Sequence, residues 1–176
     1  MTLPGGSLRQ ARIWPPASRI RAVLCDRDGT LVVDHPYNGD PAYVDPLPGV
    51  RTGLQRLRDG GLAIALITNQ SGIGRGWLRR EQVDAVNEEV ARLVGPFDCV
   101  LVCPHTAEEQ CACRKPAAQM VHDAARLLGV QPSECVVVGN SSADREAAAR
   151  AGAAAILLGD EAASFDEATE LILERS

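Results

Sequence analysis

The stretch "LCDRDGTLVVDH" (residues 24–35) places two aspartates, Asp26 and Asp28, directly after a short apolar run. In an extended strand, residues two apart point to the same side, so both carboxylates can face one site. Two close carboxylates repel each other, and they are tolerated where a cation lies between them or one holds a proton. Such a pair can supply a nucleophile and a general acid and base. The alternative is a solvated turn closed by Asp28 and Gly29, which form a common turn dipeptide.

This apolar run is one of several that alternate with helical patterns along the chain. Strands covered on both faces are typically almost entirely apolar. The expected strands are 21–25, 62–68, 99–103, 135–139 and 154–158. The expected helices are 49–59, 79–94, 116–129 and 142–152, with Pro116 in a first turn and Gly129 and Gly152 at helix ends. The alternation predicts an α/β fold with a parallel sheet between two helical layers.

Length and composition indicate a single domain. We expect it to span residues 21–176, after a loose leader over residues 1–20 that lacks the apolar segment of a signal peptide. The net charge is −5, without a cluster of Lys and Arg, and no apolar run has the length of a membrane span. We therefore expect neither nucleic acid nor a membrane as a partner. Six cysteines in a chain without a signal suggest reduced thiols and hence a cytoplasmic protein. We also expect it to be a monomer.

Polar residues follow the expected strands, at the strand ends where parallel sheets bind ligands. The loop "TNQSGIGRG" (residues 68–76) offers hydroxyls, amides and backbone N–H groups, which suit phosphate oxygens. An ordinary flexible loop is the alternative. Within "GNSSAD" (residues 139–144), Asn140 and Asp144 can offer oxygen ligands to a hard cation such as Mg²⁺. The serines between them can also cap a helix, and the two roles are compatible.

The segment "CPHTAEEQCACRKP" (residues 103–116) carries a metal-ligand pattern. Its candidate ligands are Cys103, His105, Cys111 and Cys113. Three thiolates and one imidazole suit tetrahedral zinc, and with no open position the zinc would be structural, pinning an irregular loop. Incidental thiols near a histidine are the alternative. Arg114 and Lys115 follow at once, and a lysine beside Asp26 could neutralise it and hold a phosphoryl oxygen, unless the two are a solvated basic pair.

Taken together, "DRDGTLVVDHPY", "TNQSGIGRG" and "CPH…CACRKP" resemble the haloacid dehalogenase-like (HAD) hydrolase superfamily. More narrowly, they are similar to its zinc-containing branch of D-glycero-D-manno-heptose 1,7-bisphosphate 7-phosphatases and histidinol-phosphatases. The similarity runs from about residue 21 to residue 158. It implies a three-layer α/β/α, Rossmann-like fold. The intervals between motifs leave no room for a large cap domain, so the loops 34–47 and 71–78 and the zinc loop must shield the site.

The resemblance also implies a role for each strand-end residue. Asp26 would be the nucleophile and form an aspartyl-phosphate, while Asp28 would protonate the leaving oxygen and then activate water. Thr68 and Lys115 would stabilise the phosphoryl group. The Mg²⁺ ligands would be Asp26, the backbone carbonyl of Asp28, Asn140 and Asp144. The substrate contacts would be Asp34, His35, Pro36, Tyr37, Asn69, Gln70, Ser71 and Arg114.

The implied activity is that of a Mg²⁺-dependent phosphoric monoester hydrolase acting on a phosphorylated sugar, namely a heptose 1,7-bisphosphate at the 7-phosphate. Histidinol phosphate is the alternative substrate. One departure matters: the last motif usually begins Gly-Asp, but this chain has Gly139 and Asn140, and Ser141 replaces a basic residue. Asparagine keeps a carbonyl oxygen but loses the charge, so Mg²⁺ affinity should fall. A degenerate, non-catalytic binding protein is therefore a further alternative.

Overall fold

The computed structural model describes residues 19–176 and contains a five-stranded sheet. The strands are β1 (Ala22–Cys25), β2 (Ala63–Asn69), β3 (Cys99–Cys103), β4 (Cys135–Gly139) and β5 (Ala154–Leu157). They lie in the order β3-β2-β1-β4-β5, and each neighbouring pair is parallel. The predicted parallel α/β sheet is confirmed, because each expected apolar run forms a strand near its expected bounds.

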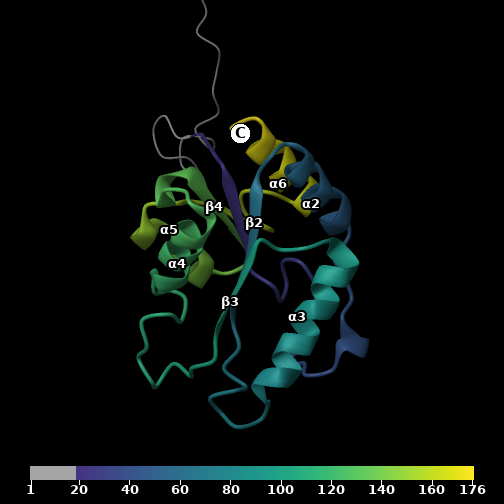
Figure 1. Ribbon diagram of the computed structural model, residues 1–176, viewed down its shortest axis with the longest axis vertical. Coiled ribbons are helices and arrows are strands. Elements are labelled where there is room, and N and C mark those ends of the chain that lie inside the picture. The colour runs from purple at the N-terminus through teal and green to yellow at the C-terminus, as the bar shows by residue number, and fades with distance from the viewer. Residues whose placement is uncertain (1–18) are drawn as a thin grey trace, which may run out of the picture.

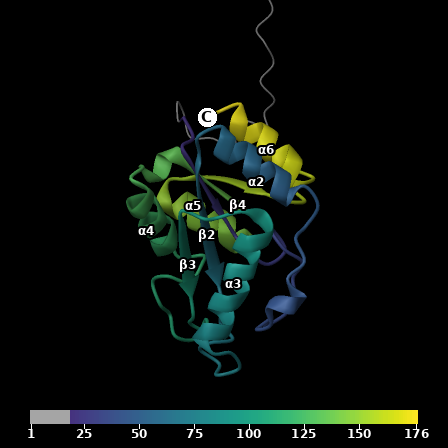
Figure 2. The same ribbon diagram turned by 45° about the vertical axis from the view of Figure 1, so that its right-hand side comes forward.

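Helices cover both faces of this sheet (Figures 1 and 2). The helices α2 (Val50–Asp59), α3 (Arg80–Val94) and α6 (Phe165–Leu173) contribute to the hydrophobic cluster on one face. The helices α4 (Gln119–Leu128) and α5 (Ser142–Ala151) contribute to the cluster on the other. Two 3₁₀ turns, η1 (Pro41–Tyr43) and η2 (Pro132–Glu134), complete the elements. The expected three layers are therefore present, and no large cap domain interrupts them within residues 19–176.

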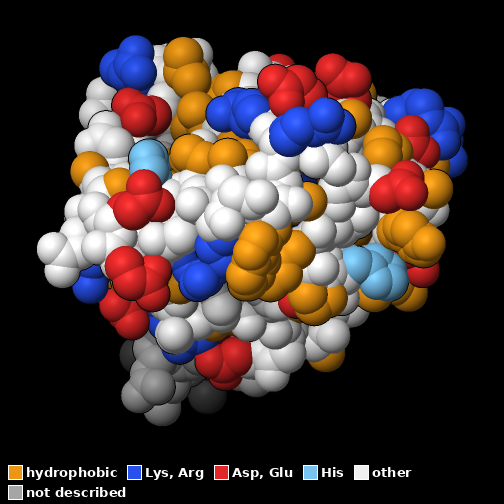
Figure 3. Space-filling model, turned by 90° about the horizontal axis from the view of Figure 1, so that it is seen from below, with side chains coloured by type: hydrophobic (Ala, Val, Ile, Leu, Met, Phe, Trp, Pro, Cys, Tyr) orange, Lys and Arg blue, Asp and Glu red, His pale blue; other side chains and the backbone are white. Residues whose placement is uncertain are grey.

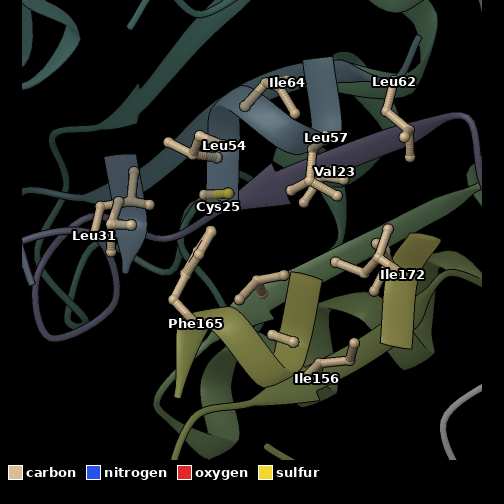
Figure 4. Close-up of a cluster of buried hydrophobic side chains, with 14 of the residues drawn as sticks. Val23, Cys25, Leu31, Leu54, Leu57, Leu62, Ile64, Ile156, Phe165 and Ile172 are labelled. Carbon is tan, nitrogen blue, oxygen red and sulfur yellow. The ribbon is translucent and has the colours of Figure 1, made fainter. Parts of the chain in front are cut away.

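Each face of the sheet has its own core because successive strand residues point to opposite sides. In β1, Val23 and Cys25 belong to one hydrophobic cluster, whereas Ala22 and Leu24 belong to the other. Figure 4 shows the first cluster, in which side chains of strands and helices pack against one another. Burial on both sides fixes the central strands firmly, so the residues at their carboxyl ends are held on a rigid support.

Helix α4 begins later than the sequence suggests. It starts at Gln119, and the Lys115–Pro116 peptide bond is cis, so the prediction that Pro116 lies in its first turn is wrong. The expected helix ends are confirmed: Gly129 and Gly152 adopt left-handed backbone angles, with φ of 68° and 79°, directly after α4 and α5. Glycine favours this conformation because it has no Cβ.

Both ends of the described chain add to the sheet domain. Residues 1–18 of the expected leader lie outside the described residues, but Ile20 is buried and its backbone N–H donates to the carbonyl of Arg175 at 2.8 Å. The sequence analysis did not predict helix α6, which packs against α2. Among the described helices, none is both long and apolar enough to cross a membrane.

The contact between α2 and α6 depends on Gly53. A Cβ at this position would lie 2.6 Å from Thr169 Oγ1 and 2.8 Å from Phe165 Cδ1, and both neighbours are buried. We predict that Gly53→Ala lowers the free energy of unfolding by about 1 kcal/mol or more, because overpacking outweighs the helix propensity of alanine. Denaturant unfolding measures the change. Thr52→Ala, on the exposed side of α2, is the control, and an equal effect of both substitutions would contradict the prediction.

Candidate active site

The strand-end residues converge because β2, β1 and β4 are neighbours in the sheet. Asp26 follows β1, Thr68 lies at the end of β2 and Asn140 follows β4. The backbone N–H of Asp26 donates to the carbonyl of Val138 at 2.9 Å, which continues the pairing of β1 with β4. The loops that follow the strands form the lower end of the molecule in Figure 1. The carboxyl edge of the sheet is thus the candidate site.

Lys115 reaches this edge from the segment between β3 and α4. Its Nζ lies 2.7 Å from Asp26 Oδ1 and 2.7 Å from Asp144 Oδ1, and it donates to the carbonyl of Ile67 at 3.0 Å. The side chain is only 3% exposed, so Lys115 is not part of a solvated basic pair. A buried ammonium group between two carboxylates is stabilised by both, and it fixes the position of each.

Burial sets the protonation of this cluster. It raises the pKa of Asp26 to about 6, with Asp144 and Asp28 acting in the same direction and Lys115 opposing them. Burial also disfavours the charged form of Lys115, but Asp26 and Asp144 outweigh this effect, so the pKa of Lys115 is raised. At neutral pH, Asp26 is therefore mostly ionised beside a charged lysine. A carboxylate in this state can attack phosphorus.

Asp28 has a different set of partners. Its carboxylate accepts from Arg27 Nε at 3.0 Å, from Arg27 Nη2 at 3.1 Å and from Gln70 Nε2 at 2.8 Å. Gly29, with φ of 73°, turns the chain directly after it. The turn and the paired carboxylates thus occur together, and each aspartate has a cation of its own. The repulsion between the two carboxylates is relieved without one shared proton.

The two amides after Thr68 hold other site residues. Gln70 Nε2 donates to Thr68 Oγ1 at 2.9 Å, which leaves the threonine hydroxyl hydrogen free for another acceptor. The side chain of Asn69 pairs with the backbone of Lys115, accepting from its N–H and donating to its carbonyl, each at 3.0 Å. In this structure the predicted substrate contacts Asn69 and Gln70 therefore orient Lys115, Thr68 and Asp28.

A group of oxygen donors suits a hard cation. Among the described residues, no hydrogen bond engages Asp26 Oδ2, the carbonyl of Asp28 or the side chain of Asn140. Asn140 lies over Gly29, where a Cβ would collide with Asn140 Nδ2. This places the amide beside the turn that follows Asp28. An all-oxygen set of this kind fits Mg²⁺, although only Asp26 brings a charge.

Asp144 stabilises the start of α5. Its Oδ2 accepts from Ser141 N at 3.1 Å and from Ser141 Oγ at 2.6 Å, while its Oδ1 contacts Lys115. Ser141 is the N-cap residue, as one of the sequence alternatives has it. Both carboxylate oxygens are occupied in this way, and the place of Asp144 in the Mg²⁺ ligand set, directly or through a bridging water, stays a prediction.

The predicted soft ligands come together in one cluster. The group consists of Cys103, His105, Cys111 and Cys113, whose ligand atoms all lie within 4.8 Å of one another. The Sγ atoms are 3.1 to 3.6 Å apart, well beyond the roughly 2.05 Å of a disulfide bond, and the cysteines are free. Three thiols and an imidazole at these spacings fit a tetrahedral metal site without an open position. The cluster can hold a metal that pins the loop before Lys115.

Three loops surround the site and contact one another. Tyr37 packs edge-on against Trp77, with ring centroids 4.6 Å apart, and the guanidinium carbon of Arg75 lies 5.3 Å from the Trp77 ring centroid. The backbone N–H of Gly74 donates to the carbonyl of Pro104 at 2.8 Å, which ties the 71–78 loop to the Cys/His loop. Figure 3 shows this end of the molecule from below, with basic, acidic and hydrophobic side chains intermixed.

The remaining predicted substrate contacts lie on these loops. Asp34, His35 and Pro36 are exposed, and a surface hollow is lined by His35, Pro36 and Tyr37 together with Tyr43 and Gln82. Ser71 and Arg114 are half-buried. Arg114 Nη1 donates to the carbonyl of His105 at 3.3 Å, so the Cys/His loop holds its side chain.

The sequence analysis did not identify a buried polar pair beside the site, Arg27 and Asn87. Arg27 stands between the paired aspartates, and Asn87 lies on the apolar face of α3, between Val83 and Val90. Arg27 Nη1 donates to Asn87 Oδ1 at 2.9 Å. The helical spacing of 83, 87, 90 and 94 could have shown that the asparagine faces the core.

Comparison with known proteins agrees with this geometry. The family model of haloacid dehalogenase-like hydrolases matches residues 38–152, which is more than half of the chain. The chain belongs to this family. The match begins after Asp26 and Asp28, so it does not include these two residues.

Curated relatives of this hydrolase are named D-glycero-beta-D-manno-heptose-1,7-bisphosphate 7-phosphatase. The protein of Haemophilus ducreyi is 36% identical over 143 residues, covering 75% of this chain and 79% of its own length. The protein of Mesorhizobium japonicum is 33% identical, covering 88% of this chain and 76% of its own. The crystal structure of a D,D-heptose 1,7-bisphosphate phosphatase from B. bronchiseptica, complexed with magnesium and phosphate, matches with a TM-score of 0.79 at 28% identity, covering 89% of this chain and 100% of that one.

The Cys/His cluster leads to a prediction about metal content. Protein purified without a chelator should hold about one metal ion per chain at this cluster, and Cys111→Ser should lose it because a hydroxyl replaces a thiolate ligand. The loop carrying Lys115 should then become sensitive to protease. Elemental analysis and limited proteolysis measure both effects. Cys99→Ser, outside the cluster, is the control, and wild-type protein without bound metal would refute the prediction.

Proposed function

We propose that this chain is a phosphatase that hydrolyses D-glycero-D-manno-heptose 1,7-bisphosphate at the 7-phosphate. The observation that carries this proposal is the buried Lys115 between Asp26 and Asp144, beside an Asp28 that has its own cation. The arrangement provides a charged nucleophile and a separately held acid and base at one strand edge. The names of the curated relatives support the choice of substrate.

In the proposed reaction, Asp26 Oδ2 attacks phosphorus while the bond from phosphorus to the sugar oxygen breaks. Asp28 gives its proton to that oxygen, and an aspartyl-phosphate remains on Asp26. Asp28 then accepts a proton from a water molecule that attacks the same phosphorus, which releases phosphate and restores Asp26. Lys115 and the hydroxyl of Thr68 stabilise the phosphoryl oxygens.

The site residues also support two metals. Asp26, the Asp28 carbonyl and Asn140 would hold Mg²⁺, which when bound supplies the positive charge that lets an anionic phosphoryl group approach a carboxylate. We assign zinc to the Cys/His cluster because three thiolates and an imidazole suit it. Free cysteines persist in a reducing compartment, so we propose that the enzyme works in the cytoplasm. We also propose that it is a monomer.

The substrate proposal predicts a ranked series of activities. With Mg²⁺ present, the heptose bisphosphate should be hydrolysed with a higher kcat/KM than histidinol phosphate or other sugar phosphates. Asp26→Asn should lower turnover by about a thousandfold or more, because the amide cannot act as the nucleophile. Phosphate release measures both. Asp59→Asn, on the exposed end of α2, is the control, and a preference for histidinol phosphate would assign the chain to that activity instead.

A second candidate function follows from Asn140. With a neutral residue at this position, the chain could bind a phosphorylated ligand without hydrolysing it. Asn140→Asp separates the two possibilities. If the wild type is inert and the variant gains Mg²⁺-dependent turnover, the native protein is a degraded enzyme. If the wild type hydrolyses a phosphate ester and Asp26→Asn abolishes this, the binding-only function is excluded.

Asn140 also predicts how the metal binds. With Asp26 as the one certain charged ligand, Mg²⁺ should bind weakly to the free protein and about tenfold more tightly when inorganic phosphate is present. Asn140→Asp should strengthen binding to the free protein by a similar factor. Calorimetric titration measures these affinities. Ser142→Asp, which adds the same charge at a neighbouring exposed position, is the control, and equal binding in all titrations would show that Asn140 is not a ligand.

A further inference from the structure

Arg27 stands between the two aspartates in the sequence, yet only 1% of its side chain is exposed. A buried guanidinium group is costly unless its donors are satisfied. Its Nε and Nη2 fork onto the two oxygens of Asp28, at 3.0 and 3.1 Å, and its Nη1 donates to Asn87 Oδ1 at 2.9 Å. The guanidinium therefore connects the catalytic end of β1 to the middle of α3.

Among the described residues, the side chain of Asn87 makes no hydrogen bond other than the one with Arg27. It is 4% exposed, on the side of α3 that carries Val83 and Val90, and among the described residues its Nδ2 has no hydrogen-bond partner. An unpaired buried donor costs about 1–3 kcal/mol, so an apolar residue would suit this face better. What the asparagine contributes is the acceptor oxygen that holds Arg27.

The paired hydrogen bonds from Arg27 leave Asp28 with few free acceptor positions. A carboxylate offers about four acceptor positions, two on each oxygen. Oδ2 accepts from both Arg27 Nη2 and Gln70 Nε2, whereas Oδ1 accepts from Arg27 Nε alone. The remaining position lies on Oδ1. With donors on both oxygens, the carboxyl group cannot rotate to exchange them.

We propose that Arg27, anchored by Asn87, is a positioning residue that presents Asp28 to the substrate through Oδ1. The inference rests on the phosphatase function proposed above. The O–H bond on Oδ1 breaks as the sugar oxygen gains the proton and the phosphorus–oxygen bond breaks. In the second step a proton of the attacking water returns to the same oxygen. Arg27 itself does not contact the reacting atoms.

Leaving groups that differ in their need for a proton test this inference. An alkyl phosphate leaves as a strongly basic alkoxide and needs the proton of Asp28, whereas an aryl phosphate leaves as a stable phenolate. Values of kcat/KM are compared because they cover only the steps up to release of the leaving group. Arg27→Lys keeps the charge but cannot bridge both oxygens. It should lower kcat/KM by about 10- to 100-fold for alkyl phosphates, and by less than about threefold for aryl phosphates.

Further variants frame this comparison. Asp28→Asn removes the proton donor itself, so it gives the largest difference in kcat/KM between alkyl and aryl phosphates that this loss can produce. Arg21→Lys, at an exposed position directly before β1, is the matched control and should leave kcat/KM unchanged for both substrates. Asn87→Ala should act in the same direction as Arg27→Lys, by about threefold to tenfold, and carries the test if the Arg27 variant does not fold. Denaturant unfolding identifies variants that are merely unstable.

Each contrary outcome has a distinct meaning. Wild-type kinetics in Arg27→Lys would show that charge alone matters, and equal losses for both substrates would show a general structural role, so either overturns the inference. A gain with alkyl phosphates in Arg27→Met would also overturn it, because proton transfer would then not need a guanidinium group that bridges both oxygens of Asp28. If the wild type hydrolyses neither substrate, the proposed function itself fails, and this inference with it.

Discussion

The ammonium group of Lys115, buried between Asp26 and Asp144, is the interaction on which the site depends. Removing one partner of a buried ion pair is strongly destabilising, because it leaves an unpaired charge away from water. Here one cation serves two carboxylates, that of Asp26 directly after β1 and that of Asp144 in the first turn of α5, and it also donates to the carbonyl of Ile67 in β2. The ends of β1 and β2 and the start of α5 are thus joined at the carboxyl edge of the sheet by a residue that belongs to none of these elements.

A lysine on an irregular loop needs support to stay in such a position. Asn69 supplies part of it by holding both backbone groups of Lys115. The Cys/His cluster supplies the rest, since its last ligand, Cys113, lies only two residues before the lysine. Residues 19–176 contain no large cap domain and only a short Cys/His loop. The hydrogen bonds of Asn69, together with a metal bound at the cluster, would therefore replace the hydrophobic packing that orders a longer insertion.

Local patterns could be predicted from the sequence, whereas contacts between residues far apart in the chain could not. Strands and most helices follow from apolar spacing, and the metal cluster follows from ligand spacing within one segment. The contact of Asn87 with Arg27 and that of Asn69 with Lys115 join residues far apart in the chain, so spacing could not show them. Helix α6 is different: Ser164 accepts from the backbone N–H of Glu167, and this Ser-x-x-Glu start was readable but overlooked.

The distribution of charge explains why phosphate and metal should depend on each other in this chain. The carboxyl groups of Asp26, Asp28 and Asp144 face two buried cations, Lys115 and Arg27, so with all three ionised this cluster carries one net negative charge, and with Asp28 protonated it carries none. An aspartate in place of Asn140 would add a further negative charge, which would attract Mg²⁺ more strongly and repel phosphate more strongly. With asparagine, the free cluster attracts the cation only modestly. A bound phosphoryl group then provides much of the negative charge that the cation needs, and the coupling between the two ligands is reciprocal.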